Sequence, residues 1–296
     1  MSWFALATYR TGSAEAPAVV VDDKLYDARQ ALPKGVAGAI ADWTKAQAAV
    51  RELGEQARAG KLSALGEGLK ALTAPIRPVR IFCAASNYIE HAKEMGSVLA
   101  AKSQSKPYMF LKLQDSVVGP GDDIVKPPET EKLDWEVELG AVIGRQARRI
   151  GVAEALDYVA GYTVVNDISA RDLNMRTDYP FKFDWFQGKS WDSFAPLGPW
   201  IVPAWLIPDP QALKLRLTVN GKDMQNDSTK NMIWNVREQV SYLSQILTLR
   251  PGDVIATGTP TGVGMGRGIF LKAGDQVEAS VENIGTLANR VVDERR

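Results

Sequence analysis

Short β-strand patterns separated by Gly and Pro dominate the chain from Val79 to its end, with only a few helical stretches between them. The clearest patterns are Trp135 to Ile143, Gly161 to Val165, Leu213 to Val219, Val254 to Thr257 and Gln276 to Glu282. Strands this short and this frequent are typical of a domain whose core is built mainly from β-sheet.

Residues 1–75 differ from the rest of the chain because they combine strand patterns with a long helical pattern. Three short strand patterns come first: Trp3 to Tyr9, Ala18 to Val21 and Lys24 to Asp27. Residues 36–59 then carry apolar positions at helical spacing and predict one or two helices. Pro75 and Pro78 follow, and proline resists continuation of a helix. We therefore predict a small N-terminal α/β domain over residues 1–75 and a larger domain over residues 76–296.

The best helical pattern in the larger domain runs from Asn235 to Leu249. Its apolar residues form one stripe: Val236, Val240, Leu243 and Leu247. Asn235 and Glu238 have the spacing of a capping box, in which each side chain accepts a hydrogen bond from the backbone N–H of the other residue. Pro251 and the glycine after it mark the end of this predicted helix.

The composition excludes several functional classes. Lys and Arg together number 35, as do Asp and Glu, so no overall positive charge attracts nucleic acid or an anionic membrane. No apolar stretch reaches the roughly 18 residues of a membrane span, and the first residues lack the basic segment of a signal peptide. Cys83 is the only cysteine, which rules out an internal disulfide and a cysteine-rich zinc site. We expect a cytoplasmic protein in which Cys83 is a buried structural thiol.

The strongest chemical signal is a pair of glutamates on one predicted strand. Glu136 and Glu138 are two residues apart, so their carboxylates point to the same face of a strand. Like charges this close repel unless a cation lies between them. Asp167 closes the strand that begins at Gly161, and three carboxylates favour Mg²⁺, Mn²⁺ or Ca²⁺ over zinc. The alternative is a solvated strand face that bears two glutamates and no metal.

His91 is the only histidine of the chain, and Glu94 follows it three residues later. Residues three apart share a face of a helix, so the carboxylate of Glu94 can orient the imidazole. Such a pair can take a proton from water. Taken alone, an ordinary surface ion pair is the simpler interpretation, because such pairs are common on helices. The chain contains no Gly-x-Ser-x-Gly motif, which argues against a serine hydrolase.

These residues belong to five motifs that follow one another along the chain. The motifs are Ser86-Asn87-Tyr88-x-x-His91-x-x-Glu94, Asp134-Trp135-Glu136-Val137-Glu138-Leu139, Gly161-Tyr162-x-x-x-Asn166-Asp167, Gly188-Lys189-Ser190-Trp191-Asp192 and Thr257-Gly258-Thr259-Pro260. In this order the chain resembles the fumarylacetoacetate hydrolase family from about residue 79 to its end. The resemblance implies an α+β fold, a mixed β-sheet roll of the family's C-terminal type, behind a small N-terminal domain. It also implies a homodimer with a Mg²⁺ or Mn²⁺ site that binds a 2-oxo acid.

The resemblance assigns roles to individual residues of this chain. The positions of the family's metal ligands are Glu136, Glu138 and Asp167. The positions of its water-activating pair are His91 and Glu94, and Lys189 matches the lysine that faces the substrate. A divalent cation among three carboxylates leaves one negative charge, which Lys189 can balance.

Three further residues resemble positions that bind substrate. Arg171 matches a family arginine near the substrate, although an ion pair with Asp172 or another acid explains it equally well. Asn174 stands where relatives often have Gln, so one substrate contact is expected to be shorter or absent. Thr259 resembles the position that holds the substrate carboxylate.

Three functions fit these residues. The first is a metal-dependent hydrolase that cleaves a C–C bond of a β-diketo acid such as an acylpyruvate, with His91 and Glu94 activating water. The second is an oxaloacetate decarboxylase, or an isomerase or tautomerase of an unsaturated 2-oxo diacid, on the same site. The third is a metal-stabilised dimer without activity, and the costly cluster of charged residues argues against it. The partner of either enzyme is a small 2-oxo or diketo acid.

Three loops are candidates for the surroundings of the site. Residues 262–268 are rich in glycine, but the following segment, 269–272, has a strand pattern, so the dinucleotide-binding fingerprint fails. Residues 177–186 are aromatic and either line the substrate pocket or extend a dimer contact. Residues 100–106 are small and polar, and we expect a mobile lid that orders when ligand binds.

Overall fold

An 11-stranded mixed sheet runs through the molecule in this computed structural model, which describes residues 3–66 and 68–295. Its strands follow the order β3-β2-β1-β13-β11-β10-β16-β5-β6, with β4 beside β1 and β7 beside β13. They are β1 Ala5–Thr11, β2 Ala14–Val21, β3 Lys24–Asp27, β4 Leu72–Thr73, β5 Arg80–Ala85, β6 Tyr108–Leu113, β7 Val117–Val118, β10 Val137–Ile143, β11 Val159–Asn166, β13 Ala195–Pro203 and β16 Val254–Ala256. The central strand β10 is buried along its whole length, which agrees with its place in the middle of the sheet.

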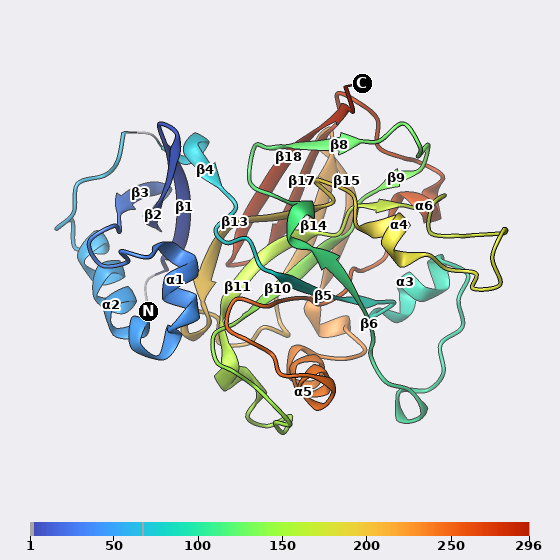
Figure 1. Cartoon of the computed structure of the whole chain (residues 1–296), viewed down its shortest axis with the longest axis horizontal. Coiled ribbons are helices and arrows are strands. Elements are labelled where there is room, and N and C mark those ends of the chain that lie inside the picture. The colour runs from blue at the N-terminus through green and yellow to red at the C-terminus, as the bar shows by residue number, and fades with distance from the viewer. Residues whose placement is uncertain (1–2, 67, 296) are drawn as a thin grey trace.

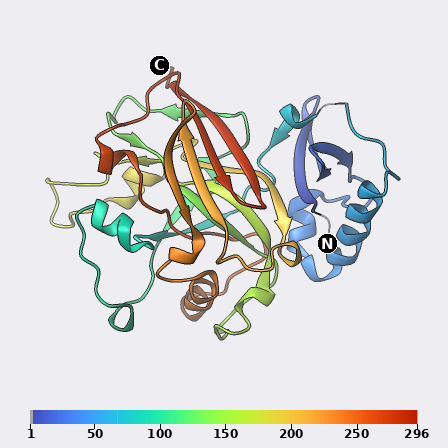
Figure 2. The same ribbon diagram turned by 180° about the vertical axis from the view of Figure 1, so that it is seen from behind.

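A five-stranded sheet in the order β15-β14-β17-β18-β8 packs against the middle of the large sheet (Figure 2). Its strands are β8 Asp123–Lys126, β14 Lys214–Val219, β15 Lys222–Ser228, β17 Gln276–Val281 and β18 Gly285–Asp293. Apolar side chains from both sheets, among them Leu139 and Leu217, form one buried core between them. Two short strands, β9 Leu133–Asp134 and β12 Ser169–Ala170, make a third, two-stranded sheet.

The N-terminal elements form one side of the molecule, coloured blue in Figure 1. The predicted helical stretch forms α1 Gly35–Ala41 and α2 Trp43–Arg58, which pack on strands β1 and β2. Strand β1 continues the large sheet by pairing with β13. The domain boundary near residue 75 stays a prediction.

The other helices are short and few: α3 Ile89–Glu94, α4 Trp185–Lys189, α5 Val236–Ile246 and α6 Gly264–Arg267. The predicted capping box at the start of α5 is confirmed, because Asn235 and Glu238 each accept a hydrogen bond from the backbone N–H of the other. Among the described residues, no helix is both long enough and apolar enough to cross a membrane. The molecule is therefore an α+β fold with several sheets, as predicted.

Two predicted strands differ in the structure. Residues 269–272 form no strand; this segment follows the short helix α6, and Leu271 donates only a single backbone bond, to Leu133. Strand β10 begins at Val137 and not at Trp135. The reason is local, since the backbone N–H of Trp135 donates to the carboxylate of Asp134 instead of joining the ladder.

Candidate active site

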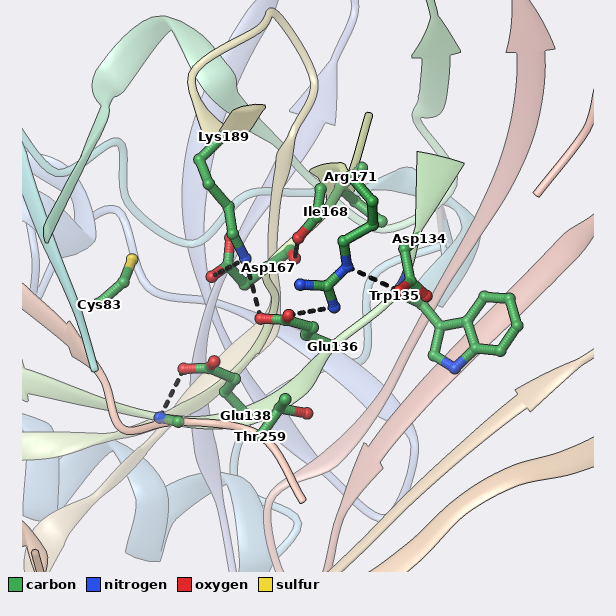
Figure 3. A network of polar contacts seen from close by, with 12 residues as sticks. Cys83, Asp134, Trp135, Glu136, Glu138, Asp167, Ile168, Arg171, Lys189 and Thr259 are labelled. Atoms are coloured by element: carbon green, nitrogen blue, oxygen red, sulfur yellow. Dashed lines mark hydrogen bonds and ion pairs between the residues drawn. The ribbon is translucent and has the colours of Figure 1, made fainter. Parts of the chain in front are cut away.

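Three carboxylates from the ends of neighbouring strands meet in the interior of the molecule (Figure 3). Glu136 lies just before β10, Glu138 lies on it, and Asp167 directly follows β11. One oxygen of each residue lies within 4.8 Å of the others, and all three side chains are buried. The sequence prediction that these three residues converge is confirmed, and the alternative of a solvated strand face is wrong.

The break in the strand before Val137 positions Glu136. Its backbone N–H donates to the side chain of Asn166 at 3.0 Å, and its carbonyl accepts from the N–H of Asp167 at 2.9 Å. These bonds tie Glu136 to the end of β11. Backbone hydrogen bonds therefore fix the positions of Glu136 and Asp167 relative to each other, in addition to the contacts that their side chains make.

Lys189, at the end of α4, bridges two of the carboxylates. Its Nζ lies 2.9 Å from Oε2 of Glu136 and 2.8 Å from Oδ2 of Asp167 (Figure 3). Burial opposes the charge of Glu136, but the ammonium of Lys189 and the guanidinium of Arg171 outweigh it and hold the pKa of Glu136 well below its usual value. The same carboxylates raise the pKa of Lys189 in spite of its burial.

Arg171 is paired within the site and not with Asp172. Its Nε donates to Oδ2 of Asp134 at 2.8 Å, and its Nη2 donates to Oε1 of Glu136. Asp172 instead accepts from Thr130 and from the backbone of Glu131. The ion pair with Asp172 was the wrong alternative, whereas a pair with another acid was correct.

Lys112 is a buried cation that the sequence analysis did not single out. It lies on β6, and its Nζ is 2.7 Å from Oδ1 of Asp167. The ammonium also donates to the carbonyls of Ile168 at 2.9 Å, Lys189 at 2.6 Å and Phe194 at 2.8 Å. Burial lowers the pKa of Lys112, although the charge of Asp167 acts against that shift. Its place within the largely apolar run of residues 108–113 was the available signal, but a lysine ordinarily lies at the surface.

Glu138 is the one carboxylate of the cluster without a cation beside it. Its Oε2 accepts a hydrogen bond from the backbone N–H of Gly258 at 2.7 Å, whereas its buried Oε1 has no partner among the described residues. Burial, and then the charges of Asp167 and Glu136, raise the pKa of Glu138 well above its usual value. Gly258 has φ +100°, and a Cβ there would lie 2.6 Å from the Cβ of Asn87, so only glycine offers its N–H here.

The donor set fits a hard divalent cation. The cluster contains four buried carboxylates, Asp134, Glu136, Glu138 and Asp167, and three buried cations, Lys112, Arg171 and Lys189. With all of them ionised, the cluster has a net charge of one negative unit. The unpartnered oxygen of Glu138 is the place in the cluster where a cation would find a free ligand. Oxygen ligands alone suit Mg²⁺, Mn²⁺ or Ca²⁺. A divalent cation would give the cluster one net positive charge, which favours an anionic ligand.

The helix α3 places His91 and Glu94 side by side. Nδ1 of His91 lies 3.4 Å from Oε2 of Glu94, and both carboxylate oxygens of Glu94 accept from the N–H of Gly262 at 3.0 Å. Burial of Glu94 opposes its ionisation, but the bonds from His91 and Gly262 outweigh burial and lower its pKa. The glycine-rich segment 262–268 therefore lies near the site, as predicted, and its Gly262 N–H holds the carboxylate of Glu94.

One cavity of about 440 Å³ collects most of the predicted site residues. The predicted residues that line it are His91, Glu136, Arg171, Asn174, Lys189 and Thr259. The amide oxygen of Asn174 is buried and has no partner among the described residues, and it lies against Gly188, where a Cβ would be only 1.5 Å away. Thr259 is less free, because its hydroxyl donates to the carbonyl of Val137 and accepts from Gln225.

The wall away from the carboxylates is apolar and partly aromatic. It includes Met95, Phe110, Met175, Phe183, Trp185 and Met265. Two of these residues, Phe183 and Trp185, come from the aromatic stretch 177–186. Of the two alternatives for this stretch, lining of the pocket is correct for these two side chains, and a dimer contact stays a prediction.

Comparisons with known proteins agree with this arrangement. The family model described as fumarylacetoacetate hydrolase C-terminal matches residues 80–292. A rat protein named mitochondrial oxaloacetate tautomerase is 38% identical over 276 residues, which cover 92% of this chain and 84% of the rat protein.

Two solved structures are also similar. Fumarylacetoacetate hydrolase from Exiguobacterium antarcticum has 31% sequence identity and a TM-score of 0.82, covering 98% of this chain and 100% of its own. Fumarylpyruvate hydrolase from Pseudomonas aeruginosa, solved in complex with Mn²⁺ and pyruvate, has 36% identity and a TM-score of 0.66. That match covers 75% of this chain and 91% of the Pseudomonas chain.

Proposed function

Since the chain belongs to the fumarylacetoacetate hydrolase family, we propose that it is a divalent-metal-dependent hydrolase that cleaves the C–C bond of an acylpyruvate-type β-diketo acid. The observation that carries the proposal is the position of His91. Its imidazole, backed by Glu94, lines the same cavity as Glu136 and Lys189. A base and one carboxylate of the cluster, Glu136, thus face one substrate-sized space, and the oxygens of Glu138 and Asp167 lie within 4.8 Å of that carboxylate.

Glu136, Glu138 and Asp167 would hold the cation, whose charge would orient the 2-oxo acid end of the substrate and stabilise the enolate that leaves on cleavage. Mg²⁺ and Mn²⁺ both suit these oxygen ligands. The Pseudomonas relative was solved with Mn²⁺ and pyruvate, which supports the same type of ligand for this chain.

His91 would act first as a base and then as an acid. It takes a proton from a water molecule, and the hydroxide adds to the carbonyl carbon farther from the carboxylate. The C–C bond then breaks, and its electron pair passes to the pyruvate enolate. His91 returns the proton to the enolate carbon, so the products are pyruvate and a carboxylic acid. Glu94 keeps the imidazole in place through this cycle.

Lys189, Arg171, Asn174 and Thr259 would position the substrate. Lys189 and Arg171 are held by Glu136, so their charges face the cavity from fixed places. Asn174 contributes to the cavity wall next to Gly188. Thr259 contributes to the cavity wall beside β10.

A second candidate is the tautomerisation of oxaloacetate, because the rat relative of that name covers 92% of this chain. The reaction moves one proton between carbon and oxygen of a 2-oxo diacid and breaks no C–C bond. His91 could carry this proton as well. The predicted homodimer and cytoplasmic location remain predictions, and the rat relative is named mitochondrial.

The experiment measures pyruvate release from acetylpyruvate, and the decay of the enol form of oxaloacetate, with Mn²⁺-loaded protein. We expect pyruvate release by the wild type and a loss of roughly 10²-fold or more in the His91→Ala variant, the scale of general-base catalysis. Glu94→Gln should also reduce the rate. Glu90→Gln is the matched control, since Glu90 lies on the same helix but is exposed and pairs with Lys93.

The outcome separates the two candidates. If the protein speeds the decay of the enol form of oxaloacetate but releases no pyruvate from acetylpyruvate, its function is that of a tautomerase and not of a hydrolase. Pyruvate release that survives His91→Ala unchanged would remove His91 from the reaction and contradict the proposed mechanism.

A further inference from the structure

A second cavity of about 260 Å³ adjoins the active-site cavity, and we call it the side cavity. Four residues line both cavities: Ala85, Ser86, Phe183 and Trp185. The remaining wall of the side cavity is mainly apolar, from Leu99, Ala100, Tyr108, Ile233 and Trp234. The two spaces are therefore neighbours that share one wall, and that wall contains two aromatic rings.

The shared wall is the centre of an aromatic stack. The ring of Trp185 lies 4.9 Å from that of Phe110 and 6.1 Å from that of Phe183, with an interplanar angle of 24° in each case. Tyr108 lies 5.9 Å from the same indole. Stacked rings of this kind offer flat apolar faces, on which another planar group packs well.

Strand β6 connects the side cavity to the carboxylate cluster. Alternate residues of a strand share a face, and Tyr108, Phe110 and Lys112 are such a set. Tyr108 lines the side cavity, Phe110 lines the active-site cavity, and Lys112 pairs with Asp167. The strand thus marks a continuous path from the predicted metal ligands to the side cavity.

Helix α4 makes the same connection from the opposite side. Trp185 and Lys189 are four residues apart, one helical turn, so they lie on one face of the helix. Lys189 contacts the carboxylates, and Trp185 forms the shared wall. A substrate held at Lys189 therefore has its distal end directed along α4 and β6 toward the aromatic stack.

The lining of the side cavity selects for an uncharged group. Among its described lining residues, Lys106 alone is charged, and that lysine is exposed to water, where an ion pair contributes little. The volume exceeds the roughly 150 Å³ of an apolar cavity known to bind benzene. The volume and the mainly apolar lining both fit a single aromatic ring.

We propose that the side cavity is a subsite for a planar apolar group, an aromatic ring, at the distal end of the substrate. The inference rests on the proposed function, because the 2-oxo acid end of the substrate must lie at the carboxylate cluster. It narrows the substrate class from acylpyruvates in general to those with an aromatic acyl group. Phe183 and Trp185 are the residues that determine this preference.

The test uses two 2-oxo acids that the enzyme cannot cleave because they lack the second carbonyl. These are 4-phenyl-2-oxobutanoate and 2-oxobutanoate, titrated into Mn²⁺-loaded protein by calorimetry. We expect the phenyl compound to bind about tenfold tighter or more. Phe183→Ala should reduce this preference by about fivefold, the scale of one aromatic contact. Phe183 is 58% exposed, so its truncation leaves the fold intact.

Phe186→Ala is the matched control. Phe186 belongs to the same aromatic stretch and is 69% exposed, but it lines a different cavity. Equal affinity of the two compounds, or an equal loss in both variants, would overturn the inference while the proposed function stands. If neither compound binds, the proposed function fails and this inference fails with it. If a 2-oxo diacid binds more tightly than the phenyl compound, and this binding depends on Lys106, the side cavity is a subsite for a carboxylate and not for an aromatic ring.

Discussion

The two ends of the active-site cavity are built in opposite ways. At the carboxylate end, Lys112, Glu138 and Asp167 are almost inaccessible to water, and salt bridges fix nearly every charge. At the aromatic end, Met175 and Phe183 expose 52% and 58% of their surfaces. In the proposed function, chemistry and selectivity would therefore be separated along one cavity. The reaction would depend on a buried network, whereas the choice of substrate would depend on exposed side chains that contribute little to the stability of the fold.

This difference has an energetic reason. Buried charges are costly unless every one of them is paired, so the carboxylate end tolerates few changes. Exposed rings contribute little to stability and can change without affecting the core. Variants at the two ends should therefore differ strongly in their effect on unfolding.

The largest effect is expected for Lys112→Met. The substitution removes the cation from Asp167 and leaves three backbone carbonyls without their donor. Loss of one member of a buried ion pair costs roughly 3–5 kcal/mol of unfolding free energy. Urea denaturation measures this loss, and turnover should fall with it. Lys106→Met, the same substitution at an exposed lysine, should change stability by less than about 0.5 kcal/mol. Similar losses of unfolding free energy in the two variants would contradict the difference between the two ends of the cavity.

An intermediate effect on the stability of the fold is expected when Glu94 is protonated at acidic pH. The folded state lowers the pKa of Glu94, so its ionised form stabilises the fold above the pKa of the unfolded chain. This contribution, about 1.5 kcal/mol at the low end of the range for hydrogen bonds to a charged group, is lost as pH falls through the lowered pKa. Melting temperatures measured from neutral to acidic pH should therefore drop more for the wild type than for Glu94→Gln. Parallel curves for the two proteins would show that Glu94 is not held as the structure has it.

The smallest effect is expected for Phe183→Ala. We expect a change below about 0.5 kcal/mol in unfolding free energy, because the ring is more than half exposed. Phe194→Ala is a buried comparison and should cost roughly 3–5 kcal/mol. A large loss at Phe183 would mean that the aromatic end is part of the core, and the separation of chemistry from selectivity would not hold.

Local patterns in the sequence predicted the parts of the site that depend on neighbouring residues. The spacing of Glu136 and Glu138 predicted a shared face, and the spacing of His91 and Glu94 predicted a pair on one helix. The capping box at Asn235 was predicted in the same way. In each case the interaction joins residues no more than three positions apart. Cys83 is buried, as its apolar surroundings predicted.

Contacts between distant residues were not predictable from spacing. Lys112 meets Asp167 across 55 positions of sequence, and Arg171 meets Asp134 across 37. Strand pairing between distant segments brings these groups together. Lys112 and Asp167 meet through strands of the large sheet, whereas Asp134 and Arg171 meet where β9 pairs with β12 in the two-stranded sheet. A lysine inside a strand is ordinarily exposed, so no local pattern predicted Lys112 in the interior. The resemblance placed Arg171 near the substrate, but it did not identify Asp134 as its partner. The expected strand at 269–272 failed for a related reason, since its apolar residues pack without a partner strand.

We propose that the buried carboxylates hold a divalent cation. Crystals grown with Mn²⁺ and measured at the manganese absorption edge would locate this cation. We expect one anomalous peak per chain, between Glu136, Glu138 and Asp167, and a weak or absent peak in crystals of Glu138→Gln. A peak only at another place, or none in the wild type, would contradict the account.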